Sequence, residues 1–181
     1  IRYSSTSRGL GDVYKRQQMK LSIVVAVADN NAIGIDNKLP WAHIREDMLW
    51  FKSNTSGKAV VMGSSTWDSL PRKPLPNRTN VVLTSRATMD GANIVLSGTP
   101  EEIIAQLSEH GDEICIIGGA KVYNDFAPYV SRMYITRVHQ VVAADTYLDV
   151  DTMLSTLGGF TRTHNEYNES AGCTFQIWDK E

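Results

Sequence analysis

The amino-acid sequence predicts an α/β domain with a mainly parallel sheet, on two observations. First, short continuous apolar runs at residues 20–28, 59–62, 80–83 and 113–117 are typical of strands that are buried on both faces. Second, segments with helical spacing separate these runs, and strands that alternate with helices favour a parallel arrangement.

Two later segments have a different pattern. Residues 133–138 and 174–178 alternate more between apolar and polar side chains. This alternation is typical of antiparallel or edge strands, which bury one face. No repeat, linker or low-complexity stretch occurs after residue 18, so one domain is expected.

Four helices are expected, and the first two lie in the N-terminal half. The first covers residues 44–55 and ends near Gly57. The second is short and begins after residues 64–66, where Ser65 or Thr66 is a suitable N-cap because a hydroxyl accepts bonds from free backbone N–H groups.

The third and fourth helices have stronger boundary signals. Thr99 is the expected N-cap of the third, with Pro100 at its first position and Gly111 as its C-cap. The fourth follows the glycines at 118–119 and extends through Phe126.

Length and composition indicate one globular domain. The chain has 181 residues, of which 42% are hydrophobic and 21% charged, with a formal net charge of -2. This charge gives no basic surface for nucleic acid, and no apolar run approaches the roughly 18 residues that a membrane helix needs. We expect neither a nucleic-acid partner nor a membrane segment. We expect the protein to be a monomer.

The first 18 residues differ from the remainder. They are rich in Ser and Arg, lack an apolar run and are followed by Met19. A transit peptide is one interpretation, because such segments are Arg- and Ser-rich and poor in acids. The interpretation we follow is a non-native or disordered leader at 1–18, with the domain at 19–181.

The cysteines give no sign of a metal site. Cys115 lies inside an apolar run and is expected to be a buried free thiol. Neither it nor Cys173 belongs to a Cys/His pattern with metal-ligand spacing. We expect no metal and, as the default compartment, a reducing cytoplasm.

A carboxylate on the apolar face of the first helix is the first candidate for chemistry. At 100° per residue, Asp47 and Phe51 differ by about 40°, and Met48 lies on the same side. Glu46 lies about 140° from Phe51, toward solvent. A buried acid next to a Gly/Asn/Pro loop suggests a functional group. The alternative is an acid in the first turn that stabilises the helix through its dipole and takes no part in chemistry.

Two strand ends carry glycine directly before a helix, at Gly63 and at Gly118-Gly119. Glycine allows close backbone approach, and a helix N-terminus offers free N–H groups to an anion. Tight turns are the alternative explanation. The chain has neither a GxGxxG nor a Walker sequence, so a standard dinucleotide fold is not indicated.

A loop with three prolines precedes Arg78. Pro71, Pro74 and Pro76 stiffen this loop, which can hold the guanidinium at the rim of a site. Arg suits bidentate binding of a carboxylate, although a solvated surface Arg is the alternative.

Taken together, the ordered motifs resemble the dihydrofolate reductase family over nearly the whole length from Met19. They are Ala26, Ile33-Gly34, Leu39-Pro40-Trp41, Asp47 with Phe51, Met62-Gly63, Thr66-Trp67, Leu75-Pro76-Asn77-Arg78, Ile117-Gly118-Gly119, Val122-Tyr123, Thr136 and Asp145-Thr146. The resemblance implies a single domain with a mixed, mostly parallel sheet of about eight strands, an antiparallel C-terminal strand and about four helices. It also implies hydride transfer from NADPH to dihydrofolate, and binding of antifolate inhibitors.

By this resemblance, Asp47 is the acid that assists pterin protonation, with a pKa raised by its apolar surroundings. Thr136 would hydrogen-bond this acid, and Trp41 would hold a water near it. The spacing of the motifs leaves Glu46 as a second candidate for this acid. Counting forward from Trp41 by the spacing of many bacterial relatives reaches Glu46, whereas counting back from Phe51 reaches Asp47. The helical face favours Asp47.

The resemblance also implies the binding residues. Those for substrate are Val24, Val25, Met48, Phe51, Leu70, Leu75, Arg78 (for the glutamate α-carboxylate) and Ile117. Those for NADPH are Ala26, Ile33, Gly34, Gly63, Ser64, Ser65, Thr66, Leu83, Thr84, Ser85, Arg86, Gly118, Gly119, Ala120, Lys121, Val122 and Tyr123. A cis peptide is implied at Gly118-Gly119, and residues 29–41 would form a loop that closes over the nicotinamide.

The chain departs from the family pattern at Ser64, where many relatives carry a basic residue that pairs with the 2′-phosphate. Weaker discrimination against NADH is therefore expected. Two other functions stay open: the riboflavin-pathway pyrimidine reductase of the same fold, and a non-catalytic folate- or nucleotide-binding module. The Leu39-Pro40-Trp41 motif, Asp47 and Arg78 favour a pterin with a carboxylate tail.

Overall fold

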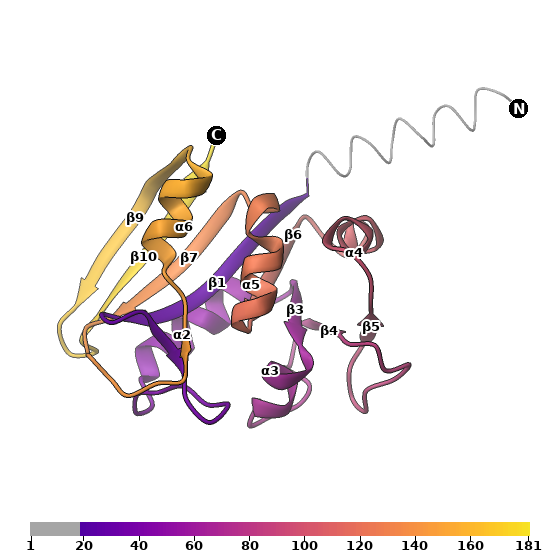
Figure 1. Cartoon of the computed structure of the whole chain (residues 1–181), viewed down its shortest axis with the longest axis horizontal. Helices are drawn as coiled ribbons and strands as arrows, with labels where there is room; N and C mark the ends of the chain where they lie inside the picture. Colours follow the sequence, from indigo (N-terminus) through magenta and orange to yellow (C-terminus); the bar gives the residue numbers. More distant parts are fainter. Residues whose placement is uncertain (1–18) are drawn as a thin grey trace, which may run out of the picture.

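A sheet of eight strands forms the centre of the computed structural model, which describes residues 19–181 (Figure 1). The expectations for residues 1–18 lie outside the described residues. In spatial order the strands are β5 (Ile94–Leu96), β4 (Thr79–Leu83), β3 (Ala59–Gly63), β6 (Glu113–Gly118), β1 (Lys20–Ala28), β7 (Arg132–Val138), β10 (Cys173–Lys180) and β9 (Phe160–Asn168). A second, two-stranded sheet pairs β2 (Ala32–Gly34) with β8 (Thr146–Tyr147).

The sheet is mixed, as expected. All neighbours from β5 to β7 are parallel, whereas β10 runs antiparallel to both β7 and β9. The strands expected at 133–138 and 174–178 are therefore not edge strands, since β7 and β10 each have a neighbour on both sides. The antiparallel interpretation is correct for β10, and β7 is parallel to β1 and antiparallel to β10.

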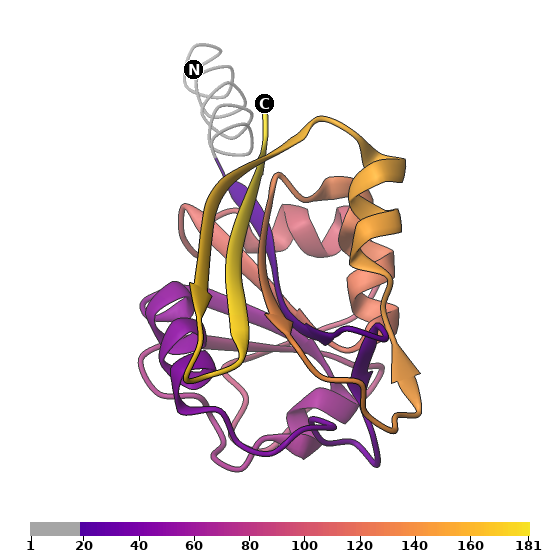
Figure 2. The same cartoon turned by 90° about the vertical axis from the view of Figure 1, so that its left-hand side faces the viewer.

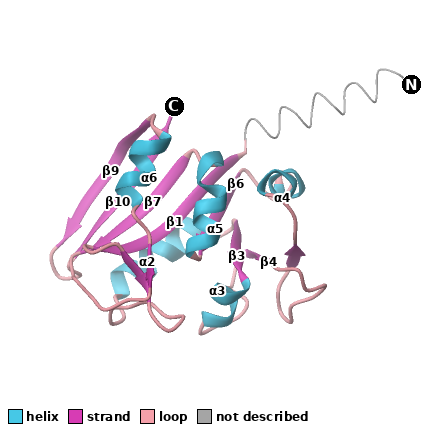
Figure 3. Ribbon diagram, viewed as in Figure 1, coloured by secondary structure: helices cyan, strands magenta, loops and turns pink. Residues whose placement is uncertain are grey.

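Helices cover both faces of the sheet. They are α2 (Arg45–Thr55), α3 (Ser64–Ser69), α4 (Pro100–Leu107), α5 (Ala120–Phe126) and α6 (Val150–Leu157), with a 3-10 turn η1 (Ala127–Tyr129). One core cluster joins α4, α5 and α6 to the sheet, and another joins α2 and α3 to the opposite face. Figure 2 shows α2 and α6 on opposite sides of the sheet, and Figure 3 shows the same elements by type.

The four expected helices are present, but some of their caps differ. Thr99 caps α4 as expected, because its hydroxyl accepts a hydrogen bond from the Glu102 N–H at 3.2 Å. The same helix ends at Leu107 with Ser108 as C-cap, so Gly111 is not its cap. The N-cap of α3 is Gly63, not Ser65 or Thr66, because the strand β3 leads directly into the helix.

Helix α6 was not among the expected helices, although its signals are present in the sequence. The Asp149 carboxylate accepts a hydrogen bond from the Thr152 N–H at 3.0 Å, and Gly158 ends the helix with φ 69°. These are ordinary start and stop signals. The strands β2, β5 and β8 were also not expected, because each has only two or three residues, and β9 was not expected because it is largely exposed.

The thiol prediction is confirmed. Cys115 is fully buried and free, and Cys173 is also buried and free. No helix within residues 19–181 combines the length and apolar character needed to cross a bilayer. Among the same residues, no group of three or more His, Cys, Asp or Glu side chains is placed to hold a metal ion.

Candidate active site

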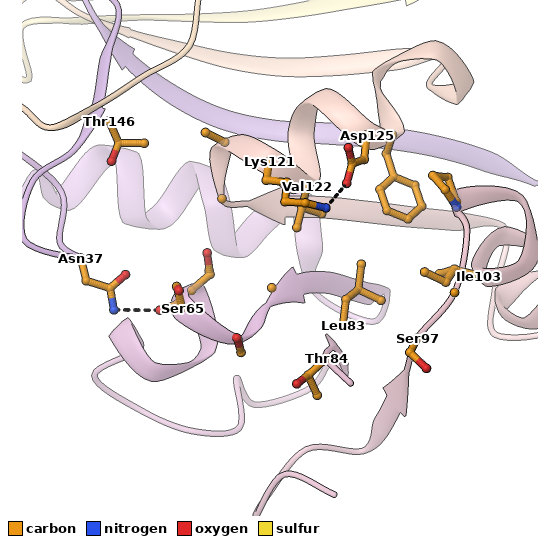
Figure 4. Close-up of a pocket in the computed structure, with 18 residues that line it drawn as sticks. Asn37, Ser65, Leu83, Thr84, Ser97, Ile103, Lys121, Val122, Asp125 and Thr146 are labelled. Atoms are coloured by element: carbon orange, nitrogen blue, oxygen red, sulfur yellow. Dashed lines mark hydrogen bonds and ion pairs between the residues drawn. The ribbon is translucent and has the colours of Figure 1, made fainter. Parts of the chain in front are cut away.

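A cleft of about 520 Å³ lies at the carboxyl ends of β3, β4, β5 and β6 (Figure 4). In open parallel sheets this edge is where ligands bind. Its lining residues are Asn37, Gly63, Ser64, Ser65, Thr66, Leu83, Thr84, Ser97, Gly98, Pro100, Ile103, Gly119, Ala120, Lys121, Val122, Asp125, Phe126 and Thr146. We call it the main cleft.

Glycines make room where two helices begin at the main cleft. A Cβ on Gly63 would lie 3.3 Å from Val122 Cγ2, tighter than most such contacts. Gly118 has φ +129°, and a Cβ there would lie 3.3 Å from Thr66 Oγ1 and 3.4 Å from the Tyr123 hydroxyl. The peptide between Gly118 and Gly119 is cis, as the resemblance implies. Glycine at each strand end thus leaves room for the helix that follows the neighbouring strand.

Hydroxyl groups dominate the polar lining of the main cleft. Ser64, Ser65, Thr66, Thr84 and Ser97 all line it. The cleft's charged lining residues are Lys121 and Asp125, whose Nζ and Oδ2 atoms lie 2.7 Å apart in an ion pair. The cleft therefore carries no net charge of its own.

Several residues that the resemblance assigns to the cofactor do not line the main cleft. Ser85 and Arg86 lie outside it, and Arg86 Nη1 makes a long contact of 3.9 Å with Met89 Sδ. The others outside it are Ala26, Ile33, Gly34, Gly118 and Tyr123. The buried Tyr123 hydroxyl donates to the Val24 carbonyl at 2.7 Å, and burial and the Asp47 charge raise the pKa of this phenol.

The loop at 29–41 borders the main cleft and is tied to the segment that precedes β8. The Asp145 N–H donates to the Gly34 carbonyl at 3.0 Å, and the Asp36 N–H donates to Asp145 Oδ2 at 2.9 Å. The Asn37 amide donates to the Ser65 carbonyl at 2.9 Å, at one side of the cleft drawn in Figure 4. Asn37 lies inside this loop and has φ 60°, a conformation that Asn tolerates well.

Asp47 is the buried acid of α2. It is 9% exposed, and the Thr136 hydroxyl donates to its Oδ1 at 2.7 Å. Burial raises the pKa of the Asp47 carboxyl, and the hydrogen bond from Thr136 partly opposes this rise. The Glu46 side chain is only half-buried and has no side-chain hydrogen bond to another described residue, so Asp47 is the more buried of the two acids.

Backbone register places the partner of this acid. Thr136 of β7 lies opposite Ala26 of β1 in the parallel ladder. Trp41 is buried among Ala28, Ala32 and other side chains at the same end of these strands. The acid, its hydroxyl partner and Trp41 thus lie near the carboxyl ends of β1 and β7.

Residues assigned to substrate divide between the two faces of the sheet. Val24 and Ile117 belong to the core cluster under α2, and Phe51, Leu70 and Leu75 pack against it. Val25 belongs to the cluster on the opposite face, because successive side chains of a strand alternate. The side chain of Val25 therefore does not face this group.

A smaller pocket of about 200 Å³ lies on the outer side of α2. Its lining residues are Arg45, Met48, Leu49, Phe51, Lys52, Leu75 and Arg78, and we call it the α2 pocket. Arg45, Leu49 and Lys52 were missed by the sequence reasoning. Their spacing with Met48 is the signal that could have found them, because these four residues form one stripe of a helix.

Local hydrogen bonds hold Arg78 at the α2 pocket. Its Nε donates to the Pro76 carbonyl at 2.9 Å and its Nη1 to Thr55 Oγ1 at 3.1 Å, while the guanidinium lies 5.7 Å from the Phe51 ring centre. Partial burial lowers the pKa of Arg78. The fully buried Asn80 fixes the loop itself, donating to the carbonyls of Leu75 and Arg78 at 3.0 and 3.1 Å.

Similar proteins share this architecture. A dihydrofolate reductase from Neisseria gonorrhoeae is 40% identical over 129 residues, which are 71% of this chain and 78% of that protein. One from Bacillus subtilis is 38% identical over 128 residues, 70% of this chain and 74% of that protein. The solved structure of dihydrofolate reductase from Enterococcus faecalis, complexed with NADP(H) and RAB-propyl, has a TM-score of 0.78 and 26% identity. The structural match covers 91% of this chain and 98% of the Enterococcus faecalis chain.

The family comparison extends over the whole described fold. The family model described as "Dihydrofolate reductase" matches residues 20–180, from the first strand of the sheet to the end of β10. With its eight-stranded sheet, the buried acid of α2 and this match, the chain belongs to the dihydrofolate reductase family.

Proposed function

We propose that this protein reduces 7,8-dihydrofolate to 5,6,7,8-tetrahydrofolate with NADPH, as an oxidoreductase of one-carbon metabolism. The observation that carries the proposal is Asp47, a buried carboxyl that is hydrogen-bonded by Thr136 at 2.7 Å and has a raised pKa. Such a group is costly unless it is used or paired, and within residues 19–181 its one side-chain hydrogen bond comes from a neutral hydroxyl.

The main cleft is the proposed NADPH site. Gly63 and Gly119 line it, where backbone can approach a ligand closely, and hydroxyls suited to phosphate oxygens surround it. Residues 63–66 and 118–122 would bind the phosphates, with Leu83, Thr84, Ser85 and Arg86 toward the adenosine. Ala26, Ile33, Gly34 and Tyr123 would lie at the nicotinamide. When bound, NADPH supplies the hydride.

The residues of this chain would handle placement and the proton. The Asp47 carboxylate would accept hydrogen bonds from the amidine-like edge of the pterin and favour protonation of the ring nitrogen beside the hydride acceptor. Thr136 orients the carboxylate through its hydrogen bond. Trp41 would hold an ordered water near it, and residues 29–41 would close over the site and exclude bulk water.

The substrate would lie along α2. Val24, Ile117, Met48, Phe51, Leu70 and Leu75 would pack against the pterin and the benzoyl group, while Val25 would contribute its backbone. Arg78 would bind the α-carboxylate of the glutamate, because Pro76, Thr55 and the Phe51 ring already hold its guanidinium in place.

The decisive experiment follows the loss of NADPH absorbance when dihydrofolate is added, with and without a diaminopyrimidine inhibitor. Turnover that the inhibitor abolishes supports the proposal. Binding of NADPH without its oxidation would instead indicate a non-catalytic module, and oxidation only with a ribosylated pyrimidine would indicate the riboflavin-pathway reductase.

Two further features are proposed with this function. We expect a monomer, which sedimentation of the purified chain tests. We also expect the cytoplasm to be its compartment, since both cysteines are buried free thiols and free thiols persist where the environment is reducing.

A further inference from the structure

Glu113 is a half-buried carboxylate at the amino end of β6, and the proposed chemistry does not use it. Its Oε2 atom accepts hydrogen bonds from the Ser22 hydroxyl of β1 at 2.8 Å and from the Tyr134 hydroxyl of β7 at 2.7 Å. Its Oε1 atom lies 3.1 Å from Lys58 Nζ and 4.0 Å from Arg132 Nη1. Burial acts to raise the pKa of this carboxyl, but the bonds from Tyr134 and Ser22 and the Lys58 charge outweigh burial, so the pKa is lowered.

Lys58 connects this carboxylate to the C-terminus of α2. Its Nζ atom donates to the Asn54 carbonyl in the last turn of the helix at 2.7 Å while it pairs with Glu113. Carbonyl groups of the last turn have no partner inside a helix, and a cation there also favours the helix dipole. Burial acts to lower the pKa of Lys58, but the negative charge of Glu113 leads the opposing effects and the pKa is raised. Lys58 is therefore charged at neutral pH.

A second attachment holds the start of α2 at the other end of the sheet. Asp47 accepts its hydrogen bond from Thr136, near the carboxyl end of β7. From Asp47 to Asn54 the helix rises about 10 Å at 1.5 Å per residue. From Thr136 back to Arg132, beside Glu113, β7 extends about 13 Å at 3.3 Å per residue. The helix thus runs from the carboxyl to the amino end of β7, with one attachment near each end.

Side chains proposed to contact the substrate lie on α2 between these attachments. Phe51 packs against the core cluster that contains Tyr134. Trp50 meets the Tyr134 ring edge-on, with 6.4 Å between the ring centroids, so a donor to Glu113 also contacts the middle of the helix. A helix attached only at its start is free to tilt or slide, and a displacement of about 1 Å in the placement of reacting groups can cost a hundredfold in rate.

We propose that the Lys58–Glu113 pair positions α2 for the reductase reaction, by holding the helix at the height on the sheet where Asp47 and Phe51 meet the substrate. This inference rests on the proposed function. Neither Lys58 nor Glu113 lines the main cleft or the α2 pocket, so both are positioning residues that act through the helix.

The test variants are Lys58→Gln and Glu113→Gln, assayed well below Tm. Each should lower the single-turnover rate of hydride transfer about three- to tenfold and raise KM for dihydrofolate by a similar factor, a fraction of the cost of a 1 Å displacement. KM for NADPH should stay within about twofold of the wild type, because α2 does not line the main cleft. Lys58→Arg keeps the charge and should bring the rate back toward the wild type.

Asp151→Asn is the matched control. It also removes the carboxylate partner of a partly buried cation, because Asp151 pairs with Arg137 at 2.8 Å. That pair joins α6 to β7 on the face of the sheet opposite α2 (Figure 2). The control should lower Tm and leave the hydride-transfer rate and both KM values unchanged.

Three outcomes would overturn the inference. They are a lower Tm with unchanged kinetic constants in Lys58→Gln, an equal loss of rate in Asp151→Asn, and an equal loss in Lys58→Arg and Lys58→Gln. If Glu113→Gln does not fold, Lys58→Gln decides alone, because it leaves the hydrogen bonds from Ser22 and Tyr134 to Glu113 in place.

Calorimetric binding of folate and of NADPH separates this inference from the proposed function. Turnover of dihydrofolate by the wild type, with the same constants in Lys58→Gln, overturns the positioning role and leaves the reductase activity in place. If the wild type shows no turnover but binds folate more tightly than Lys58→Gln does, with equal affinity for NADPH, the positioning of α2 is supported and the proposed function is overturned.

Discussion

The Thr136 hydroxyl donates a hydrogen bond to Asp47 Oδ1 at 2.7 Å, which joins a helix to a strand of the sheet across 89 positions of the chain. The acid is on α2 and the hydroxyl is on β7, beside Ala26 of β1. The carboxyl is therefore fixed by the fold itself and not by neighbours in sequence. Its position and its raised pKa lead to the first three predictions.

Replacement of Asp47 by Asn should lower the rate of hydride transfer at neutral pH by about two to four orders of magnitude, the usual contribution of a positioned acid or base. The amide keeps the shape but cannot carry the charge that favours pterin protonation. Single-turnover measurement of NADPH oxidation gives this rate. The matched variant is Glu46→Gln, one residue away and only half-buried, which should stay near the wild type. Near-normal activity in Asp47→Asn with loss in Glu46→Gln would show that the wrong acid was chosen.

The same substitution should stabilise the protein at neutral pH. Burial raises the pKa of Asp47 in the folded state, so folding is most favoured when the carboxyl is protonated. That contribution is complete below the ordinary carboxyl pKa and is lost as pH rises through the raised folded-state pKa. Asn does not ionise, so Tm of Asp47→Asn should exceed that of the wild type at pH 7 by about 2–4 °C per kcal/mol gained. The difference should disappear in acid, and a difference that persists there would contradict this origin.

Thr136→Val should move the pH profile. The Thr136 hydrogen bond lowers the pKa of Asp47, so its loss raises that pKa further. The pH at which the hydride-transfer rate falls to half should move upward, and Thr136→Ser should restore it because the hydroxyl is kept. If Val and Ser lower the rate equally with no movement of the profile, Thr136 has only a packing role.

The sequence predicted the parts of this site that depend on local pattern. The buried position of Asp47 was predicted because helical geometry places it on the face of Phe51, and the position of the glycines at 63 and 118–119 because they follow buried strands. Contacts between segments that are distant in the sequence could not be predicted in this way. Nothing near Asn37 indicates that its amide reaches the Ser65 carbonyl, and Lys52 resembles any solvated helix lysine until Arg78 is seen across the α2 pocket. The largely exposed β9 has no apolar run to reveal it.

Arg78→Lys should raise KM for dihydrofolate more than it lowers kcat. The Lys ammonium keeps the charge but loses the planar fork and the contacts with Thr55 and Pro76 that orient it. We expect a rise in KM of about tenfold, equivalent to ~1.4 kcal/mol of lost carboxylate binding. Steady-state kinetics with saturating NADPH measures both constants. An unchanged KM would show that Arg78 does not bind the glutamate α-carboxylate of the substrate.

Ser64→Arg should increase the preference for NADPH over NADH. The charged side chains that line the main cleft are Lys121 and Asp125, which pair at 2.7 Å, and Arg86 lies outside the cleft, so no unpaired cation lines the cleft beside Ser64. An Arg at the start of α3 would reach an added phosphate with charge-assisted hydrogen bonds, as Arg does in other NADP sites. We expect KM for NADPH to fall about three- to tenfold at low salt, with KM for NADH unchanged, because exposed pairs of this kind are screened. Ser64→Gln is the control of similar length without charge, and an equal effect of Gln would show that size and not charge decides.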